Sequence, residues 1–351
     1  MIHVVTPYGR RGPSSRVRVF EWLDRTSFDH VLSSYLAHSN SSPAHLLRHP
    51  VAVLNAERRL RRMATEGSEL LWLHREASPL SRGALERKLF AGASFAVYDF
   101  DDALHVDWGT GGLYRRLAPK APKAHLAVRS ADRVVAGNAV LADWASQHND
   151  DVVIIPSCVS PASYRQKTDY TVGDPPRLGW IGSPDNEAFL LLLEPSLREV
   201  HRRTGARLTL VGTSRPRLGD LEAIIDRMPW SEAAQYDQLS EFDVALAPLP
   251  DDPYSRGKCG YRLLQYGAAA VPAVGSPVGV NERILDEFGM PAVEDDRDWT
   301  EAILDLLARP ADAREALGRT ALTVVERGYS YDAWQPRWED AVGVGAPVRT
   351  P

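Results

Sequence analysis

The chain has 351 residues, of which 44% are hydrophobic and 25% are charged, a balance typical of an ordinary folded protein. Single cores stop growing near roughly 250 to 300 residues, so this length excludes one ordinary core and predicts two domains. The formal net charge of −5, with both signs interspersed, excludes a strongly basic nucleic-acid binder.

In the first half of the chain, short apolar runs alternate with segments of helical character. The runs occupy residues 2–6, 70–73, 95–98, 133–136 and 152–155. This alternation predicts a largely parallel, doubly wound sheet. The stretch 167–177 is polar and rich in glycine and proline, which is typical of a linker. We therefore place a first Rossmann-like domain at residues 1–170.

The alternation restarts after the linker. Apolar runs lie at 178–181, 208–211, 243–247 and 271–274, and helical patterns lie at 186–203 and 260–268. They predict a second Rossmann-like domain at 171–328, and the aromatic-rich stretch 329–351 predicts a helix that packs back toward the first domain. The expected fold class is α/β, with two doubly wound domains facing across a cleft. Ligands of such sheets lie beyond the carboxyl ends of the strands.

The turn after the first strand contains Gly9 and Gly12, and a helix carrying Arg16 is expected to begin near Ser14. Backbone N–H groups at such a helix start can receive a phosphate or a hydroxyl-rich ligand. The spacing is not the G-x-G-x-x-G of a dinucleotide site. A tight turn with Ser14 as N-cap would explain the same residues. Gly9, Gly12 and Arg16 are candidate substrate-binding residues.

Polar side chains also follow the strands at 70–73 and 95–98. His74 and Arg75 close the first of these strands, and Asp99, Asp101 and Asp102 close the second. Clustered carboxylates repel one another unless cations, hydrogen bonds or water offset the charge. We predict Asp101 and Asp102 as catalytic residues that orient or deprotonate an acceptor hydroxyl. His74, Arg75 and Asp99 are predicted to bind substrate nearby, although helix capping and solvation would also account for the aspartates.

A proline-rich loop at 248–257 leads from the strand at 243–247 into the helix at 260–268. Lys258 stands at the expected helix start, with Arg256 before it and Arg262 after it. An anionic phosphate would find cations and helix-end N–H groups together here. We predict Lys258 as a catalytic cation. The neighbouring residues predicted to bind the same substrate are Arg256, Cys259, Gly260, Tyr261, Arg262 and Gln265.

This segment resembles the family 4 retaining glycosyltransferases, which have the GT-B fold. Their donor-binding half carries a helix with two glutamates eight positions apart, then a proline-containing strand and a glycine loop. The residues that fit this pattern are Gly260, Leu264, Ala268, Pro272 and Gly279. The fit puts Gly257 and Gln265 at the two glutamate positions, so both acids are absent. Gln265 can still hydrogen-bond to two hydroxyls, whereas Gly257 has no side chain.

The resemblance extends over nearly the whole chain, including 134–138, where Asn138 precedes a helix, and 179–183 with Gly182 and Ser183. Asn138, Gly182 and Ser183 are therefore further candidate substrate-binding residues. The family's basic pair normally follows the latter strand, but 182–186 contains no cation. Lys258, with Arg256 or Arg262, is the expected substitute.

The resemblance also implies a reaction. It implies transfer of a hexosyl-type group from a nucleoside-diphosphate sugar to a small-molecule or glycan acceptor, with retained configuration and without a metal or cofactor. Domain 1–170 would bind the acceptor and domain 171–328 the donor. Asp101 fills a position where the family often has a histidine, and Asp102 matches an acidic residue.

The cysteines and the length of the apolar runs bear on the cellular location of the protein. Cys158 and Cys259 are far apart in sequence and suit a reducing cytoplasm, and no apolar run is long enough for a secretion signal or a membrane span. The Arg- and Leu-rich stretch 44–62 leaves peripheral membrane contact open, with a solvated helix as the alternative.

Three other functions remain open at this point. The missing glutamates would suit a catalytically idle GT-B protein that binds a nucleotide sugar or a partner enzyme. A sugar-nucleotide epimerase would share the architecture and need no acceptor. A nicotinamide oxidoreductase is disfavoured because the fingerprint glycines and the ribose-binding acid are missing.

Overall fold

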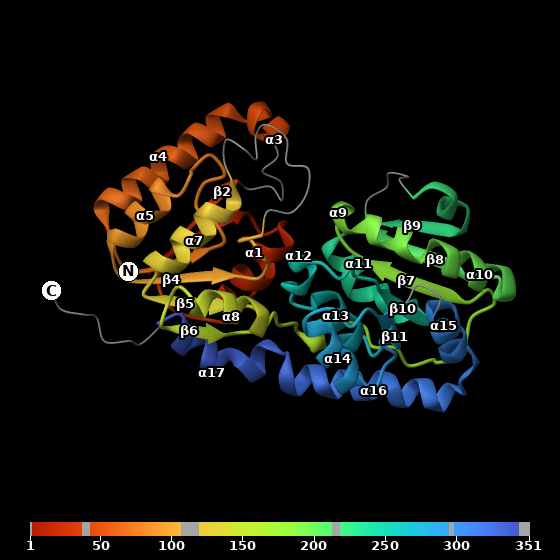
Figure 1. Cartoon of the computed structure of the whole chain (residues 1–351). Coiled ribbons are helices and arrows are strands. Elements are labelled where there is room, and N and C mark those ends of the chain that lie inside the picture. The colour runs from red at the N-terminus through yellow and green to blue at the C-terminus, as the bar shows by residue number, and fades with distance from the viewer. Residues whose placement is uncertain (1, 37–42, 107–118, 213–217, 295–297, 344–351) are drawn as a thin grey trace. The chain divides into compact units, whose positions relative to one another are not determined.

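A computed structural model describes residues 2–36, 43–106, 119–212, 218–294 and 298–343 (Figure 1). The chain divides into two compact units. Unit 1 comprises Met1–Ser157, Arg256–Cys259 and Trp334–Pro351, and unit 2 comprises Cys158–Ser255 and Gly260–Ala333. The first unit thus ends earlier than the expected boundary at 170, and it takes four residues from the middle of the second half.

Unit 1 is built on a six-stranded parallel sheet with the order β2-β1-β3-β4-β5-β6. Its strands are β1 (Ile2–Tyr8), β2 (His30–Leu36), β3 (Ser68–His74), β4 (Ala93–Phe100), β5 (Arg133–Ala136) and β6 (Val152–Ile154). The apolar runs locate five of these strands. Strand β2 was not predicted, because this edge strand interrupts its apolar residues with Ser33 and Ser34.

In unit 1, helix α5 packs on both α4 and α7 (Figure 1). The helical elements are α1 (Pro13–Ser15), the π-helical turn η1 (Arg16–Phe20), α2 (Glu21–Leu23), α3 (Pro43–Arg48), α4 (Pro50–Glu66), α5 (Ala84–Ala91), α7 (Lys120–Ser130) and α8 (Ala139–Ser146). Gly12 is the N-cap of α1 and Pro13 its first residue, so Ser14 is not the N-cap that the sequence suggested. Proline suits this position because the first helical N–H needs no partner within the helix.

Unit 2 is built on a five-stranded parallel sheet with the order β11-β10-β7-β8-β9. The strands are β7 (Arg177–Ile181), β8 (Arg207–Gly212), β9 (Ile225–Pro229), β10 (Val244–Ala247) and β11 (Ala273–Gly275). Strand β9 was not predicted, because Asp226 and Arg227 break its apolar pattern at the edge of the sheet. With both sheets parallel and doubly wound, the predicted α/β fold class is confirmed.

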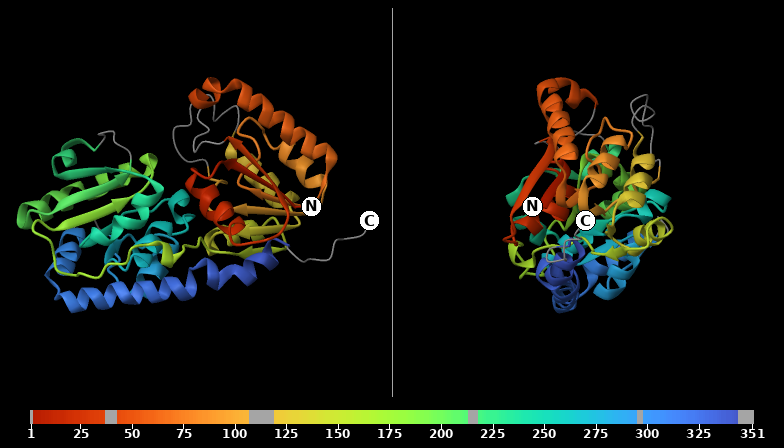
Figure 2. Two further views of the ribbon diagram at one scale, coloured as in Figure 1. Left: turned by 180° about the vertical axis from the view of Figure 1, so that it is seen from behind. Right: turned by 90° about the vertical axis from the view of Figure 1, so that its left-hand side faces the viewer.

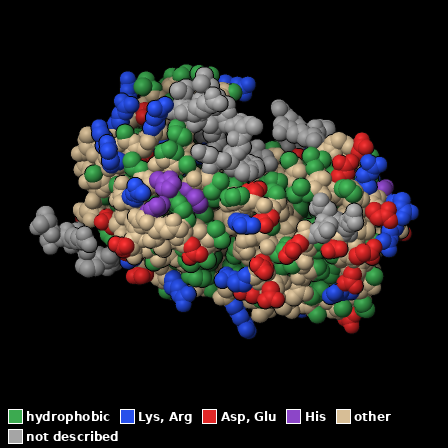
Figure 3. All heavy atoms as spheres, viewed as in Figure 1, with side chains coloured by type: hydrophobic (Ala, Val, Ile, Leu, Met, Phe, Trp, Pro, Cys, Tyr) green, Lys and Arg blue, Asp and Glu red, His purple; other side chains and the backbone are tan. Residues whose placement is uncertain are grey.

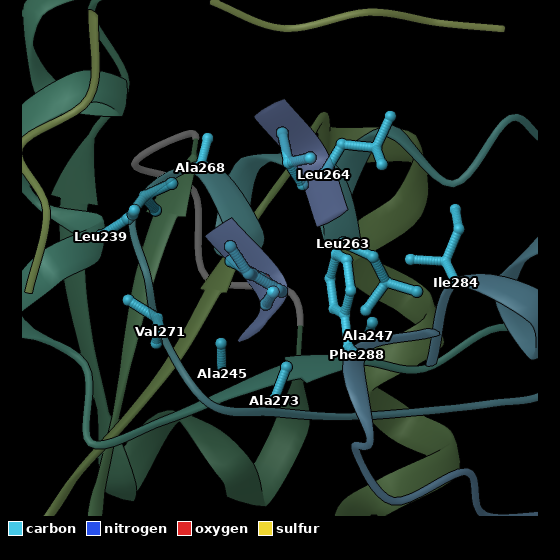
Figure 4. Packing of buried hydrophobic residues seen from close by; sticks show 14 of the residues in the cluster. Leu239, Ala245, Ala247, Leu263, Leu264, Ala268, Val271, Ala273, Ile284 and Phe288 are labelled. Carbon is cyan, nitrogen blue, oxygen red and sulfur yellow. The ribbon is translucent and has the colours of Figure 1, made fainter. Parts of the chain in front are cut away.

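Both faces of the second sheet are buried. Along β7, Trp180 belongs to one apolar cluster and Ile181 to the other, because neighbouring side chains of a strand point to opposite faces. The cluster of Trp180 includes α10 (Glu194–Thr204) and α15 (Asp298–Ala308). The cluster of Ile181, seen in Figure 4, includes α13 (Tyr261–Ala268), α14 (Val280–Phe288) and α16 (Ala311–Gly328). Shorter pieces complete the unit: η2 (Pro161–Ser163), α9 (Pro184–Glu187), η3 (Ala188–Leu193), η4 (Gly219–Ile224), α11 (Glu232–Asp237), η5 (Leu239–Glu241) and α12 (Pro253–Arg256).

The stretch predicted as a linker lacks helix and strand between 164 and 176, yet it packs on unit 2. Tyr164 and Tyr170 are buried. The Lys167 N–H donates to the carbonyl oxygen of Ala269 over 2.9 Å, and the Tyr170 hydroxyl donates to that of Ala270 over 2.8 Å. These anchors explain why the unit boundary precedes the polar stretch.

The last helix, α17 (Tyr331–Ala341), contributes to unit 1 from Trp334 onward. The Trp338 ring is fully buried and stacks on Trp22 with a centroid distance of 4.7 Å, and its edge meets Trp72 at 5.2 Å. The aromatic residues of the C-terminal stretch thus complete the core around β3. Among the helices that the structure describes, none is long and apolar enough to cross a bilayer.

Candidate active site

The strand orders define where each unit can hold a ligand. In unit 1, β2 and β3 lie on opposite sides of β1, and in unit 2, β8 and β10 lie on opposite sides of β7. At such a switch point the connections leave the sheet in opposite directions and open a crevice at the carboxyl ends of the strands. The predicted residues after β1, β3 and β7 therefore lie where a doubly wound sheet binds its ligand.

A buried charge network lies at the end of β4 in unit 1. Arg18 donates to both carboxylate oxygens of Asp99, from Nε over 3.1 Å and from Nη2 over 2.6 Å. Its Nη1 donates to the carbonyl oxygen of Ile155 over 2.6 Å. His74 Nδ1 lies 2.8 Å from the same carboxylate. Burial by itself raises the pKa of Asp99, but Arg18 and His74 outweigh it and hold that pKa below its usual value.

Arg18 was missed by the sequence analysis. The signal was present, because this arginine stands between two apolar residues, Val17 and Val19, on the helical run after the glycine turn. All three side chains are buried. A charged residue inside an apolar run needs a buried partner, and that partner lies 81 positions away in sequence at Asp99.

Arg75 holds the other two aspartates. Its Nε donates to Asp101 over 2.6 Å and its Nη2 donates to Asp102 over 2.5 Å. The Arg75 backbone has a φ of 60°, a left-handed conformation that costs roughly 1–3 kcal/mol for a residue other than glycine. The Tyr98 hydroxyl stabilises this turn by donating to the Arg75 carbonyl oxygen over 3.0 Å.

Asp101 and Asp102 are both partly exposed, unlike Asp99. Burial raises the pKa of Asp101, but the charges of Arg75 and His74 lower it more, so Asp101 is a carboxylate at neutral pH. His74 Nε2 lies 3.9 Å from Asp101 and 3.5 Å from the hydroxyl oxygen of Ser14. The ends of β3 and β4 therefore meet the helical run that follows β1.

The Gly9–Gly12 turn is tight. The Gly12 N–H donates to the Gly9 carbonyl oxygen over 2.8 Å, and a Cβ atom on Gly12 would lie 2.4 Å from that of Tyr8. Glycine is therefore required at position 12 by packing alone. Arg16 is buried directly after this turn.

The segment Arg256–Cys259 belongs to unit 1, although its sequence lies in the second half. Lys258 Nζ lies 3.8 Å from Asp102 Oδ1. We expected Lys258 in the donor-binding half, and its position beside Asp102 corrects that expectation about location. The reason is long-range packing, which the local pattern of a loop before a helix does not reveal.

Asn138 fixes this segment. Its Oδ1 accepts from the Leu141 N–H over 2.9 Å as the N-cap of α8, and its Nδ2 donates to the carbonyl oxygens of Gly257 and Lys258 over 2.9 and 3.0 Å. The predicted substrate-binding Asn138 is thus engaged in capping and in holding the segment. A Cβ atom on Gly257 would lie 2.6 Å from that of Ala103, so the first family glutamate position has no room for a side chain.

Cys259 completes the contact with the aspartate loop. Its thiol donates to the carbonyl oxygen of Asp101 over 3.3 Å, and a Cβ atom on Gly137 would lie 2.4 Å from its sulfur. Burial and the charge of Asp101 raise the pKa of the Cys259 thiol to about 12. Cys259 therefore stays protonated and donates a hydrogen bond. The side chain of Arg256, at the start of the same segment, is exposed.

In unit 2, a cation lies beside the glycine that follows β7. Arg262 Nε donates to the Ile181 carbonyl oxygen over 2.7 Å, and its guanidinium lies 4.6 Å from the centroid of the Trp180 ring. The Cβ position of Gly182 is only 2.9 Å from Arg262 Nη2. The sequence of the loop at Gly182 and Ser183 contains no cation, but the fold brings Arg262 of α13 beside this loop.

The other residues of α13 that were predicted to bind substrate are buried or half-buried. Gly260 is its N-cap with a φ of 65°, and Tyr261 is half-buried. Gln265 is buried, and its amide donates to the Tyr164 hydroxyl over 3.3 Å. Gln265 therefore ties the stretch after the unit boundary to α13. Among the described residues, no group of three or more His, Cys, Asp and Glu is arranged to hold a metal ion.

Each unit has a parallel, doubly wound sheet with polar residues at its strand ends, which places the chain among two-domain α/β proteins. Residues 175–309 match the family model described as Glycosyl transferases group 1. This segment therefore resembles the group 1 glycosyltransferases, the chain has the GT-B fold, and together they support a glycosyltransferase. The resemblance noted in the sequence is confirmed.

Solved structures show the same fold along nearly the full chain. The sucrose-phosphate synthase of Thermosynechococcus elongatus has a TM-score of 0.70 at 15% identity and covers 97% of each chain. Anabaena HepE in complex with UDP and glucose has a TM-score of 0.71 at 11% identity, with 97% of this chain and 98% of that chain covered. WaaG, a glycosyltransferase of lipopolysaccharide biosynthesis, has a TM-score of 0.64 at 13% identity, covering 99% and 100%. No curated protein sequence matches the chain.

Proposed function

We propose that this glycosyltransferase moves a sugar from a nucleoside-diphosphate sugar to an acceptor hydroxyl, with retained configuration and without a catalytic metal ion. The observation that carries the proposal is the Arg262 guanidinium beside Gly182, at the carboxyl end of β7. This is the switch point of unit 2, where an open parallel sheet binds its ligand.

Arg262 is in our proposal the cation for the donor diphosphate. Burial lowers the pKa of Arg262, but an arginine stays protonated in proteins, so its charge is retained. The guanidinium offers a planar fork of donors that matches phosphate oxygens, and the N-terminus of α13 adds a positive partial charge. A protein cation at this place takes over the charge balance that a metal ion would otherwise supply. HepE, which has the same fold, has been crystallised with UDP and with UDP-glucose.

Asp101 and Asp102 are the proposed acceptor-binding groups. Arg75 fixes both carboxylates, and Lys258 balances the charge of Asp102. Because the pKa of Asp101 is lowered, this carboxylate orients the acceptor hydroxyl and is a weak proton acceptor. The hydroxyl then attacks the sugar carbon on the face from which the diphosphate departs, and its proton passes to a leaving diphosphate oxygen. In this arrangement Lys258 serves the aspartates, and Arg262 serves the donor.

The test of the donor site is thermal stabilisation by UDP, GDP, dTDP and ADP in the presence of EDTA, with NAD and NADP as controls. A ligand that binds only the folded state raises its stability, and at 100 times its Kd the gain is about 2.7 kcal/mol. We expect one diphosphate to raise the Tm of the wild type and to lose this effect in Arg262→Ala. A shift that requires a divalent metal, or one given by NAD or NADP alone, would contradict the proposal.

A second candidate function is binding of a nucleotide sugar without turnover. Two observations favour it: Gly257 has no room for a catalytic side chain, and Gln265 is buried against Tyr164. The two functions are distinguished by incubating the protein with a panel of acceptors and with the nucleoside-diphosphate sugar whose diphosphate raises the Tm. Transfer with an anomeric configuration equal to that of the donor, read from NMR coupling constants, supports the enzyme. Inverted product would refute retention, and a bound but unconsumed donor would favour the idle protein.

A further inference from the structure

The helix α4 presents two different faces. Its buried residues Ala56, Leu60 and Met63 pack on unit 1. A helix turns by about 100° per residue, which places Val51 and Arg58 on the side opposite to this stripe. Both views in Figure 2 show α4 at the periphery of unit 1, and the side chains of Val51 and Arg58 are exposed.

Apolar side chains are exposed at the start of this outward side. Leu47 of α3 is 81% exposed, and Val51 and Leu54 of α4 are 70% and 49% exposed. Scattered single apolar residues on a surface need no explanation, but three large ones within eight positions form a patch. Leu46 beside them is buried, so the exposure is not a general feature of the stretch.

Arginines continue the same side. The stretch 43–66 holds five arginines and two glutamates, in a chain whose net charge is −5. Arg61 and Arg62 lie 3.9 and 3.2 Å from Glu57 and Glu66, but both arginine side chains are more than three-quarters exposed. Exposed pairs of this kind are worth roughly 0–1 kcal/mol, so the arginines can exchange these partners for others. Figure 3 shows Lys and Arg side chains gathered over α4.

We infer that this surface docks unit 1 on an anionic lipid bilayer. The docking face is defined as Leu47, Val51, Leu54, Arg58, Arg61 and Arg62. Basic residues next to exposed apolar ones match the two layers of a bilayer interface, anionic headgroups and the acyl boundary beneath them. A soluble polyanion would satisfy the arginines but would leave the apolar side chains in water. The docking face lies outside the candidate active site, and its role does not depend on the proposed reaction.

Co-sedimentation of the full chain with vesicles tests the inference. We compare phosphatidylcholine vesicles with vesicles containing about 30% phosphatidylglycerol, at low salt and at 0.5 M salt. Each basic residue near an anionic surface contributes roughly a fivefold gain in binding. The wild type should bind the anionic vesicles at least tenfold more tightly than the neutral ones, and salt should weaken this binding because it screens the charges.

Two variants separate the charge from the apolar contact. The triple variant Arg58→Glu, Arg61→Glu and Arg62→Glu and the double variant Leu47→Ser and Val51→Ser should each weaken binding to anionic vesicles at least tenfold. Matched controls come from unit 2. The triple variant Arg198→Glu, Arg202→Glu and Arg203→Glu on α10 and the double variant Leu191→Ser and Leu192→Ser in η3 make the same changes at exposed residues of unit 2. They should bind as the wild type does.

Far-ultraviolet circular dichroism and the Tm confirm that every variant is folded. The Arg→Lys triple variant at 58, 61 and 62 keeps the charge and should retain binding. Absence of binding by the wild type, or equal losses in the controls, overturns the inference. So does full binding by the Leu47→Ser, Val51→Ser variant together with competition by dextran sulfate, which would identify a soluble polyanion as the ligand. Stabilisation by a nucleoside diphosphate should be unchanged in all docking-face variants, which keeps this test separate from that of the donor site.

Discussion

At the scale of single residues, the contact between Arg18 and Asp99 determines how the loop after β4 is held. Both side chains are almost completely buried, and the pair makes two hydrogen bonds. His74 and the Ile155 carbonyl oxygen occupy the remaining positions around it. A buried pair of this kind costs desolvation, but removal of one partner leaves the other charge buried and uncompensated.

The variant Arg18→Met keeps much of the side-chain volume and removes the charge. We expect it to lower the free energy of unfolding by about 3–5 kcal/mol, because Asp99 is left without its cation. Urea unfolding followed by circular dichroism measures the change. The matched control is Arg198→Met, whose exposed pair with Asp220 should be worth less than about 1 kcal/mol. Similar losses of unfolding free energy in the two variants would contradict the argument that burial makes the contact of Arg18 with Asp99 the stronger one.

The two aspartates with lowered pKa predict acid sensitivity. Asp99 and Asp101 titrate below the unfolded aspartate value of about 3.9, so they contribute stability above that pH. This contribution is lost as the pH falls through their folded pKa values, because the unfolded chain then binds more protons. We expect the free energy of unfolding to fall steeply below about pH 4. A variant Asp101→Asn should show a shallower fall, and an unchanged slope would contradict the assignment.

Arg262 is the residue on which the donor site depends. Arg262→Ala should weaken binding of the preferred nucleoside diphosphate by about 10- to 100-fold, because hydrogen bonds to charged groups contribute about 1.5–3 kcal/mol each. Titration calorimetry with the diphosphate measures the loss. Arg202→Ala, an exposed arginine of α10 in the same unit, is the control and should bind normally. Equal affinity of Arg262→Ala and wild type would remove Arg262 from the donor site.

At the scale of elements, the segment Arg256–Cys259 shows how one loop is fitted into unit 1. Gly257 lies against Ala103, Gly137 lies against Cys259, and Asn138 joins the two sides. Each contact leaves less space than a methyl group needs. The glycines at 137 and 257 are therefore required by close packing, since neither has a positive φ.

Gly257→Ala tests this packing. The added Cβ would lie 2.6 Å from that of Ala103, so we expect a loss of about 1–3 kcal/mol from overpacking. The second substitution Ala103→Gly should restore part of the loss. A double-mutant cycle of unfolding free energies measures the coupling between the two positions. Simple additivity of the two changes would show that the segment does not pack on Ala103.

At the scale of the whole molecule, the end of the chain completes the core of unit 1. Trp338 stacks on Trp22 and meets Trp72 of β3, and all three rings are buried. Residues more than 260 positions apart thus form one aromatic cluster. Unit 1 cannot be obtained by cutting the chain at the boundary after Ser157.

Trp338→Ala should destabilise unit 1 by about 3–5 kcal/mol, because it removes a large buried side chain and leaves a cavity. Hydrogen exchange of the β3 amides reports this change, and the amides of β7 in unit 2 serve as the internal reference. Trp230→Ala, which replaces a partly exposed ring, should cost less than about 1 kcal/mol. Equal protection of β3 in wild type and Trp338→Ala would exclude this role.

Features that depend on neighbours along the chain could be predicted from the amino-acid sequence. Apolar periodicity located nine of the eleven strands in the described part of the chain, and the order of glycine, proline and small residues pointed to the glycosyltransferase family. The edge strands β2 and β9 escaped because they bury only part of their side chains and lack a continuous apolar run. The strand ends also predicted that His74, Arg75 and the aspartates would meet, because parallel strands end at the same edge of the sheet.

The residues that come together at each site from distant parts of the sequence became apparent only in the folded chain. The sequence places Lys258 at a helix start close to Arg262, but the two residues contact different units. Lys258 lies near Asp102 in unit 1, and Arg262 lies beside Gly182 in unit 2. Gln265 looks free to bind hydroxyls but is buried against Tyr164, and Arg18 finds Asp99 far along the sequence. The physical reason is that desolvation and close packing act between residues brought together by the fold, and local periodicity contains no record of those partners.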